Sequence, residues 1–161
     1  MSVKIGDRLP AATFRVIGED GPKPRPGEEI FKGRKVVLFG VPGAFTPTCH
    51  KNHLPGFLAH YTDFKSKGVE EIAVVSVNDV HVMGAWAKAT AGDDRISFLA
   101  DGNGDFAKAI GLDFDASAGG MGRRLKRFAM LVEDGVIKQL NVEDIPSKAD
   151  ASSAAVLLGQ I

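Results

Sequence analysis

The chain has 161 residues, of which 44% are hydrophobic and 25% charged, a composition typical of an ordinary globular protein with one core. Lysine plus arginine and aspartate plus glutamate both total 20, so there is no basic excess of the kind that nucleic-acid binding needs. Apolar runs are far shorter than the ~20 residues of a membrane-spanning helix, and the first residues do not form a signal-peptide core. We therefore expect a single cytoplasmic domain, residues 1–161, without a nucleic-acid or membrane partner.

Short β-branched runs alternate with helical patterns through most of the chain. The first predicted elements, in chain order, are a stiff proline-rich surface loop at 22–27, a strand at 36–41 and a helix at 46–67 that is interrupted by Pro55-Gly56. A strand at 71–77, a helix at 79–89, a strand at 96–100 and a helix at 106–110 capped by Asp105 follow. The last elements are strands at 127–132 and 136–140, joined by a Glu133-Asp134-Gly135 turn, and a helix at 151–158. Strands that alternate with helices and end in a hairpin predict an α/β fold, thioredoxin-like, with a central mixed β-sheet covered by helices on both faces.

The only cysteine, Cys49, is a candidate nucleophile. A lone cysteine is more often a small buried hydrophobe, but this one follows Thr46, a favoured N-cap residue, and Pro47, which suits the first helical position. That register places Cys49 in the first turn of a helix, where unpaired backbone N–H groups and the helix dipole favour the thiolate over the thiol. With one cysteine, no disulfide can form within the chain.

A second positive charge is needed beside the sulfur, because a helix dipole contributes only about 0.3–1 kcal/mol at an exposed site. Arg127 is the best candidate. It alternates with Leu125, Ala129 and Leu131 on its predicted strand, so its guanidinium points to an apolar face and requires an anion there. The alternative is that Arg127 belongs to a solvated basic cluster over residues 123–127, and spacing alone does not separate the two.

The residues around the cysteine resemble a known family. Pro42, Thr46 and Cys49 form the pattern P-x-x-x-T-x-x-C, which is the peroxiredoxin signature. Three stretches, in the expected order, resemble the peroxiredoxin-5-like, or type II, subfamily: VPGAFTPTCHKNHLPGF (41–57), VVSVNDVHVMGAW (74–86) and RRLKRFAMLVEDGV (123–136). The likeness covers most of the chain. It implies a thiol peroxidase of antioxidant defence that acts on hydrogen peroxide and organic hydroperoxides and uses no cofactor.

The resemblance also implies a role for each catalytic residue. Cys49 would attack the terminal peroxide oxygen and become a sulfenic acid. Thr46 would hydrogen-bond the peroxide or the thiolate, and Pro42 would shield the sulfur from water. Arg127 would hold the thiolate and stabilise negative charge on the departing oxygen.

Two further residues, Thr48 and Gly43, are predicted to bind substrate. The backbone N–H groups of Cys49 and Thr48 would complete the peroxide pocket, whereas the Thr48 side chain is given no role.

The expected partners follow from the absence of a second cysteine. Type II members with a resolving cysteine carry it at the position of Val74 or near Ala151, and neither is cysteine here. The resemblance therefore implies a one-cysteine enzyme whose sulfenic acid is reduced by an outside thiol, either glutathione with glutaredoxin or thioredoxin. It also implies a homodimer, with contacts predicted at Phe45, Trp86, Leu112 and Phe114.

The same residues allow other interpretations. Cys49, His50 and His53 could ligate a metal, but a closed zinc site needs four ligands, and we predict no metal. Cys49 with His81 could form a Cys-His hydrolase, although nothing in the sequence orients a base toward the sulfur. A thiol-disulfide oxidoreductase lacks its C-x-x-C motif here. A non-enzymatic thiol redox sensor is the main alternative function.

Overall fold

Consecutive apolar residues in β3 (Lys35–Val41) are buried on both faces of a central sheet. Val37 and Phe39 belong to one core cluster, whereas Val36 and Leu38 belong to the other. Successive strand residues point to opposite faces, so a strand that is apolar at every position needs cover on both sides. The short β-branched run thus forms the middle of the sheet.

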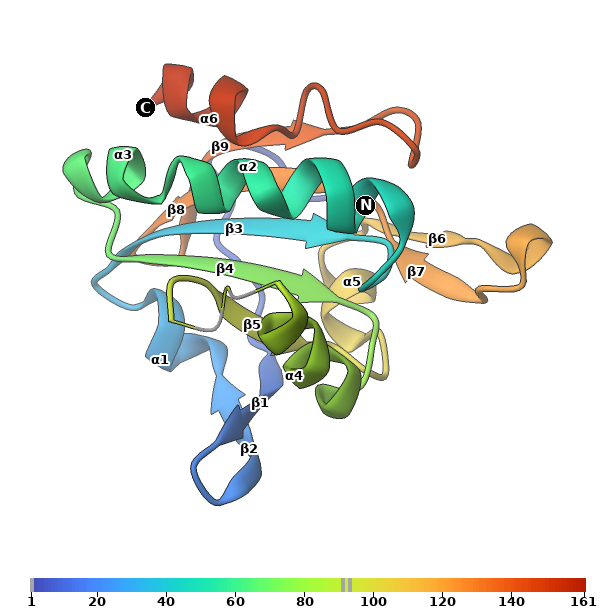
Figure 1. Cartoon of the computed structure of the whole chain (residues 1–161). Helices are drawn as coiled ribbons and strands as arrows, with labels where there is room; N and C mark the ends of the chain where they lie inside the picture. Colours follow the sequence, from blue (N-terminus) through green and yellow to red (C-terminus); the bar gives the residue numbers. More distant parts are fainter. Residues whose placement is uncertain (1, 91, 93) are drawn as a thin grey trace.

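The computed structural model describes residues 2–90, 92 and 94–161 (Figure 1). Its strands are β1 (Thr13–Gly18), β2 (Gly21–Pro26), β3 (Lys35–Val41), β4 (Glu71–Ser76), β5 (Ser97–Ala100), β6 (Asp113–Asp115), β7 (Arg123–Leu125), β8 (Phe128–Glu133) and β9 (Val136–Val142). Its helices are α1 (Gly27–Phe31), the π-helical turn η1 (Cys49–His53), α2 (Leu54–Ala59), α3 (Tyr61–Ser66), α4 (Val80–Ala89), α5 (Asp105–Ala109), the 3-10 turn η2 (Ser117–Gly119) and α6 (Ala154–Gln160).

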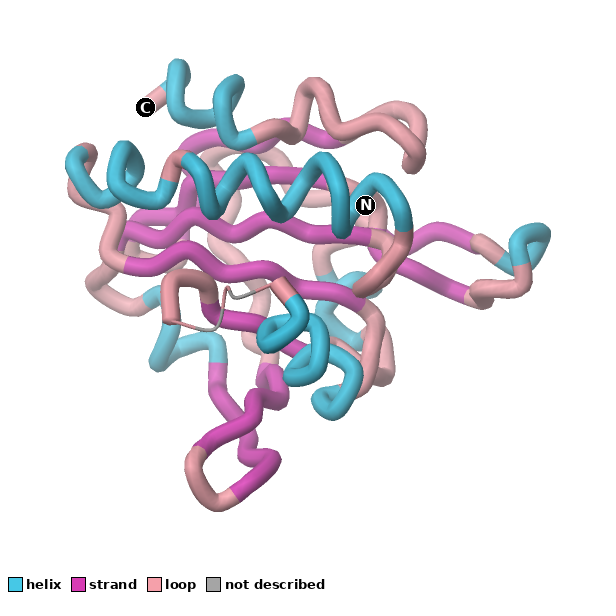
Figure 2. Tube along the Cα trace, viewed as in Figure 1, coloured by secondary structure: helices cyan, strands magenta, loops and turns pink. Residues whose placement is uncertain are grey.

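Seven strands form one mixed sheet in the order β2-β1-β5-β4-β3-β8-β9. β3, β4 and β5 run parallel, and the outer pairs are antiparallel. Helices α2, α3, α4 and α6 pack on one face, and α1 and α5 on the other (Figure 1, Figure 2). The predicted α/β architecture is therefore confirmed. In the part of the chain described, no helix is long and apolar enough to cross a membrane.

The proline-rich stretch is an edge strand, so its prediction as a loop was wrong. β2 pairs antiparallel with β1, and Pro22, Pro24 and Pro26 each occupy a register position in that pair. Prolines spaced two apart lie on the same side of the ladder, so all three missing N–H groups can face away from β1 toward the open edge. The sequence prediction missed both β1 and β2.

The predicted interruption at Pro55-Gly56 is also wrong. The chain is helical from Pro47 through Ala59, and the first break comes at His60. The N–H of Leu54 donates to the C=O of Cys49, five residues earlier, which makes η1 a π-turn. This wider turn lets a proline without an N–H group enter the helix just behind it.

Two helix starts differ from their predictions. The first turn of α5 is capped by Asp101, whose carboxylate accepts the N–H groups of Phe106 at 3.0 Å and Ala107 at 2.9 Å, and not by Asp105. The last helix begins at Ala154 and not at residue 151, because Ser153 caps it. In both places several cap-forming side chains stand close together in the sequence, and tertiary packing selects one of them.

One carboxylate, Glu71 at the start of β4, ties three elements together. Its oxygens accept hydrogen bonds from Arg25 at 2.6 and 2.8 Å, from Arg34 at 2.7 Å and from Ser97 at 2.5 Å. Burial alone would raise the pKa of Glu71, but the bonds from Arg25, Ser97 and Arg34 outweigh it and lower that pKa from 4.5 to about 2.

Glu71→Gln is expected to lower the free energy of unfolding by about 3 kcal/mol at neutral pH, since that is the value of the pKa shift. The folded pKa lies below the unfolded one, so this stabilisation is complete above pH 4.5 and is lost as the pH falls toward about 2. Urea unfolding of both proteins across this pH range measures it. The matched control is Glu28→Gln, in an ion pair with Lys32 that is 75% exposed on both sides; equal stability losses for the two variants would contradict the prediction.

Candidate active site

Cys49 lies at the edge of the sheet where the parallel strands end. β3 ends at Val41, a short loop follows, and the helix begins at Pro47. In its first turn, the N–H of His50 donates to the C=O of Thr46 at 2.9 Å. Cys49 is therefore in the first turn, at the position predicted from its neighbours, and its side chain is fully buried. The carboxyl ends of strands are where open α/β sheets bind their ligands.

The guanidinium of Arg127 lies against the sulfur. Its Nη2 donates to Sγ of Cys49 at 3.0 Å, and its Nε donates to the C=O of Pro146 at 3.1 Å. Only 2% of Arg127 is exposed, so it does not belong to a solvated basic cluster. Leu125, which the alternation placed on the same face, packs in the opposite core cluster because the chain leaves β7 before it enters β8.

A third residue, His53, completes this group and was missed as a site residue. Its Nδ1 lies 3.1 Å from Nη1 of Arg127, and its Nε2 lies 2.9 Å from the C=O of Ser152. Because a guanidinium only donates and a carbonyl only accepts, Nε2 carries the hydrogen and Nδ1 accepts. Burial, and then the Arg127 charge, lower the pKa of His53 to about 3, so the ring is neutral. Its position four residues after Cys49 was the available signal.

The segment that follows β9, residues 143–153, forms a strap over the site. Its carbonyl groups accept hydrogen bonds from three site residues: Pro146 from Arg127, Ser147 from Thr48 and Ser152 from His53. The carboxylate of Glu143 holds the strap by accepting both the N–H and the hydroxyl of Ser152 at 2.6 Å. Main-chain acceptors have no sequence signature, so the strap was not predictable.

The loop between β3 and the helix holds Pro42, Gly43 and Thr46. The Thr46 hydroxyl donates to the C=O of Gly43 at 2.6 Å, so it does not use its hydrogen elsewhere. A Cβ on Gly43 would lie 3.0 Å from the Thr46 methyl group and 3.2 Å from Nη1 of Arg124. These contacts would be too close, which explains why a residue without a side chain occupies this position. Arg124 also donates to the C=O of Pro42 at 3.3 Å. Both Pro42 and Gly43 are buried.

Two aromatic contacts surround the next helical residue. Nδ1 of His50 accepts the indole N–H of Trp86 at 3.0 Å, and the His50 ring stacks on Phe45. Trp86 and Leu112 are buried within this chain, so their prediction as dimer contacts was wrong. Phe45 is 47% exposed and Phe114 partly exposed.

His50 and His53 thus bond to two different partners, Trp86 and Arg127. Among the residues that the structure describes, no three or more His, Cys, Asp or Glu side chains are grouped to hold a metal ion. His81 is exposed on α4, and no contact joins it to Cys49 in the described part of the chain.

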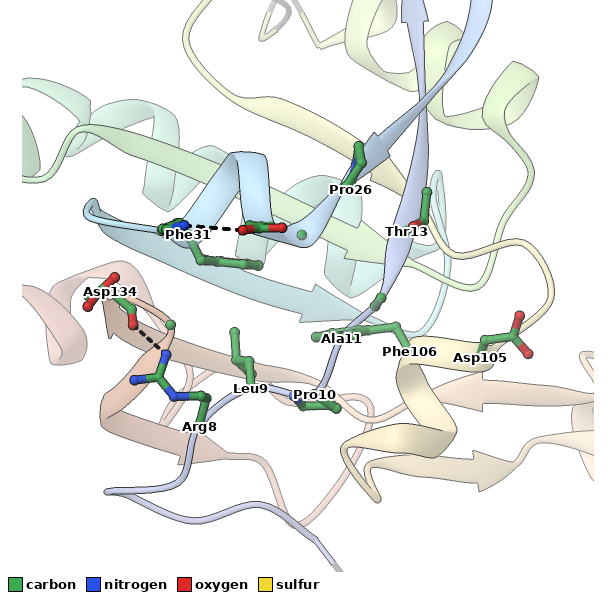
Figure 3. Close-up of a pocket in the computed structure, with 15 residues that line it drawn as sticks. Arg8, Leu9, Pro10, Ala11, Thr13, Pro26, Phe31, Asp105, Phe106 and Asp134 are labelled. Atoms are coloured by element: carbon green, nitrogen blue, oxygen red, sulfur yellow. Dashed lines mark hydrogen bonds and ion pairs between the residues drawn. The ribbon is translucent and has the colours of Figure 1, made fainter.

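A cleft lies on another part of the molecule, away from Cys49. It has a volume of about 1000 Å³ and is lined by residues 8–13, by α1 and by the start of α5 (Figure 3). Phe31 and Phe106 in its wall belong to the core cluster on the sheet face opposite Cys49. None of the residues bonded around Cys49 lines this cleft.

Comparisons with known proteins agree along almost the whole chain. The family model Redoxin matches residues 4–158. Peroxiredoxin-2C of Oryza sativa is 46% identical over 143 residues, which is 88% of each chain. Reduced Prx3 of Vibrio vulnificus in complex with hydrogen peroxide superposes with a TM-score of 0.93, at 45% identity over 98% of each chain. Peroxiredoxin 5 of Alvinella pompejana gives a TM-score of 0.86, at 35% identity over 97% of this chain and 96% of its own. Since the backbone and the sequence both follow these relatives, this chain belongs to the peroxiredoxin family and has its thioredoxin-like fold.

Proposed function

We propose that this peroxiredoxin is a thiol peroxidase that reduces hydrogen peroxide and organic hydroperoxides through Cys49. The observation that carries the proposal is the 3.0 Å contact between Nη2 of Arg127 and the Cys49 sulfur. A guanidinium that is 2% exposed needs a counter-anion, and its other two acceptors are a carbonyl and a neutral imidazole. The sulfur is the one partner among these three that can carry the negative charge, which supports a thiolate.

The first half-reaction oxidises the sulfur. The Cys49 thiolate attacks the terminal oxygen of R–O–O–H, an S–O bond forms, and the O–O bond breaks. The sulfur loses two electrons and becomes a sulfenic acid, Cys–S–OH, while RO⁻ leaves and takes a proton from water. Arg127 uses three of its five N–H groups in the bonds already described, and the other two are the proposed donors to the peroxide oxygens as charge develops.

The neighbouring residues support this step. The Thr46 hydroxyl donates to Gly43, so toward a peroxide it offers a lone pair, which fits an acceptor for the peroxide O–H. Because Gly43 has no side chain, its carbonyl can lie close enough to accept the Thr46 hydroxyl, and buried Pro42 excludes water from the sulfur. The Thr48 hydroxyl is held by the strap carbonyl of Ser147 at 3.0 Å, which leaves its backbone N–H as the proposed contact with substrate.

The second half-reaction needs thiols from outside the chain, because Cys49 is the only cysteine. One thiol attacks the sulfenic sulfur, an S–S bond forms and water leaves; a second thiol then breaks the mixed disulfide and releases the Cys49 thiolate. We propose glutathione with glutaredoxin as the reductant, and thioredoxin as the second candidate. Offering each system to the oxidised protein and following peroxide loss separates the two.

Stopped-flow mixing of reduced protein with stoichiometric hydrogen peroxide tests the proposal. The single tryptophan, Trp86, reports the reaction by fluorescence, since its indole N–H bonds to His50 beside Cys49. We expect oxidation faster than that of free cysteine by at least about three orders of magnitude, as a preorganised, positively charged site provides. The same protein in denaturant is the control. A folded protein that reacts no faster than the free thiol would overturn the proposal and favour a non-enzymatic redox sensor.

We propose that the chain, as one domain over residues 1–161, forms a homodimer in which Phe45 and Phe114 take part, since both keep exposed surface. Light scattering at working concentration measures the mass, and a monomer would contradict it. We propose the cytoplasm, where thiol reductants are present, as the location; similar proteins include a mitochondrial and a chloroplastic one of Arabidopsis thaliana.

A further inference from the structure

We propose that His53 is a positioning residue that aims the Arg127 guanidinium at the Cys49 sulfur and, being an uncharged acceptor, leaves the positive charge to that sulfur. The inference rests on the proposed function, because it concerns how the Arg127 donor is held for the same reaction. It is carried by the contacts of the imidazole ring, which acts through Arg127 and does not bond to the sulfur.

The guanidinium is a rigid plane, so fixing two of its nitrogens fixes the third. Nε is held by Pro146 at 3.1 Å and Nη1 by His53 at 3.1 Å, and Nη2 is then left facing the sulfur at 3.0 Å. Without the acceptor on His53, the guanidinium plane of Arg127 could rotate about its Cδ–Nε bond. His53 therefore determines the direction in which Nη2 donates.

His53 is itself held on every side. It is fully buried, and its ring meets the edges or faces of Phe39 and Phe57 at centroid distances of 5.1 and 5.5 Å. Its Nε2–H donates to Ser152, whose N–H and hydroxyl are in turn bound by Glu143. This chain of contacts connects the end of β9 to the sulfur through one ring of fixed orientation.

The neutrality of the ring decides the charge balance. Arg127 is the ionisable group that contacts the ring, Cys49 lies one turn earlier on the same helix, and the carboxylate of Glu143 accepts hydrogen bonds from Ser152. A carboxylate at position 53 would form an ion pair with Arg127 and weaken its attraction for the thiolate. A neutral acceptor orients the guanidinium without competing for its charge.

Three substitutions separate orientation from charge. His53→Phe fills the same space without an acceptor, and we expect the rate constant of Cys49 oxidation to fall about tenfold or more, the effect of losing one orienting hydrogen bond to a charged group. His53→Asn restores an acceptor oxygen close to the Nδ1 position and should stay within about threefold of wild type. His53→Asp should slow oxidation and move the formation of the thiolate to higher pH.

Stopped-flow oxidation and the ultraviolet absorbance of the thiolate against pH give the two readouts, and circular dichroism checks the fold. His60→Phe and His60→Asn, in a partly exposed histidine paired with Asp63, are the matched controls. If His53→Phe does not fold, Glu143→Gln is the substitute test. It weakens the hold on Ser152 and leaves the His53 ring between the two phenylalanines unchanged, and it should shift the same readouts in the same direction by a smaller amount.

The outcomes distinguish the two proposals. A wild-type protein that reacts like a free thiol overturns the proposed function. A fast wild type with equally fast His53→Phe and His53→Asp variants, and unchanged pH profiles, overturns the role of His53 alone. Equal losses for His53→Phe and His53→Asn would show that the ring only fills space, and would also overturn it.

Discussion

Cys49→Ser is expected to abolish peroxide turnover, with a loss of at least about three orders of magnitude, because a hydroxyl is neither ionised nor oxidisable under the same conditions. The sulfur atom supplies both the nucleophile and the site where oxygen is held as sulfenic acid. Serine would also leave the buried guanidinium of Arg127 without an anion, so some loss of stability is expected as well. Peroxide consumption with an excess of reductant measures the turnover.

The chain has no second cysteine to mutate as a matched control. Wild-type protein alkylated at Cys49 therefore serves for comparison, and it should be as inactive as the serine variant. Intact mass after peroxide treatment distinguishes oxidation at the sulfur from oxidation at a methionine. Catalytic turnover by a folded Cys49→Ser protein would contradict the assignment of the nucleophile.

Arg127→Lys is expected to slow Cys49 oxidation by about a hundredfold, although it keeps the charge, since removal of a preorganised donor at a reacting centre has effects of this size. The guanidinium contacts Pro146, His53 and Cys49 with three different nitrogens at once. An ammonium group is a single point and cannot meet three acceptors in these directions. The thiolate should also form at higher pH, which its ultraviolet absorbance will show.

Arg123→Lys is the matched control for this substitution. Arg123 lies four residues earlier on the β6–β7 hairpin, where it pairs with Asp113 at 2.8 Å and its side chain is 59% exposed. This variant should oxidise at the wild-type rate. Unchanged kinetics for Arg127→Lys would refute the role of Arg127, whereas equal losses for both variants would show that the loss does not depend on the hydrogen bonds of Arg127 at the site.

The site couples peroxide chemistry to a segment far away in the chain. The strap, residues 143–153, contributes no side chain to the sulfur, yet its carbonyl groups accept from Thr48, Arg127 and His53. Main-chain acceptors do not ionise, so they orient the donors without altering the charge at the site. A buried arginine can in this way be held firmly while its charge is left for the sulfur, as the proposed function requires.

The sequence by itself determined the features that depend on near neighbours. The position of Cys49 in the first helical turn follows from Thr46 and Pro47, and the buried β3 follows from its continuous apolar run. The hairpin around Asp134 and Gly135 was equally local. In each case backbone hydrogen bonding and steric preference act over a few residues, and these are written in the order of the amino acids.

Only the tertiary structure decided which distant groups meet the sulfur. Arg127 lies 78 residues from Cys49 and reaches it because β8 pairs antiparallel with β3. Ser152 lies 99 residues from the ring of His53 that it holds. The edge strand β2 formed in spite of its prolines because β1 was there to pair with it. Such contacts depend on how strands and helices pack across the sheet, and no pattern within a short stretch of sequence carries that information.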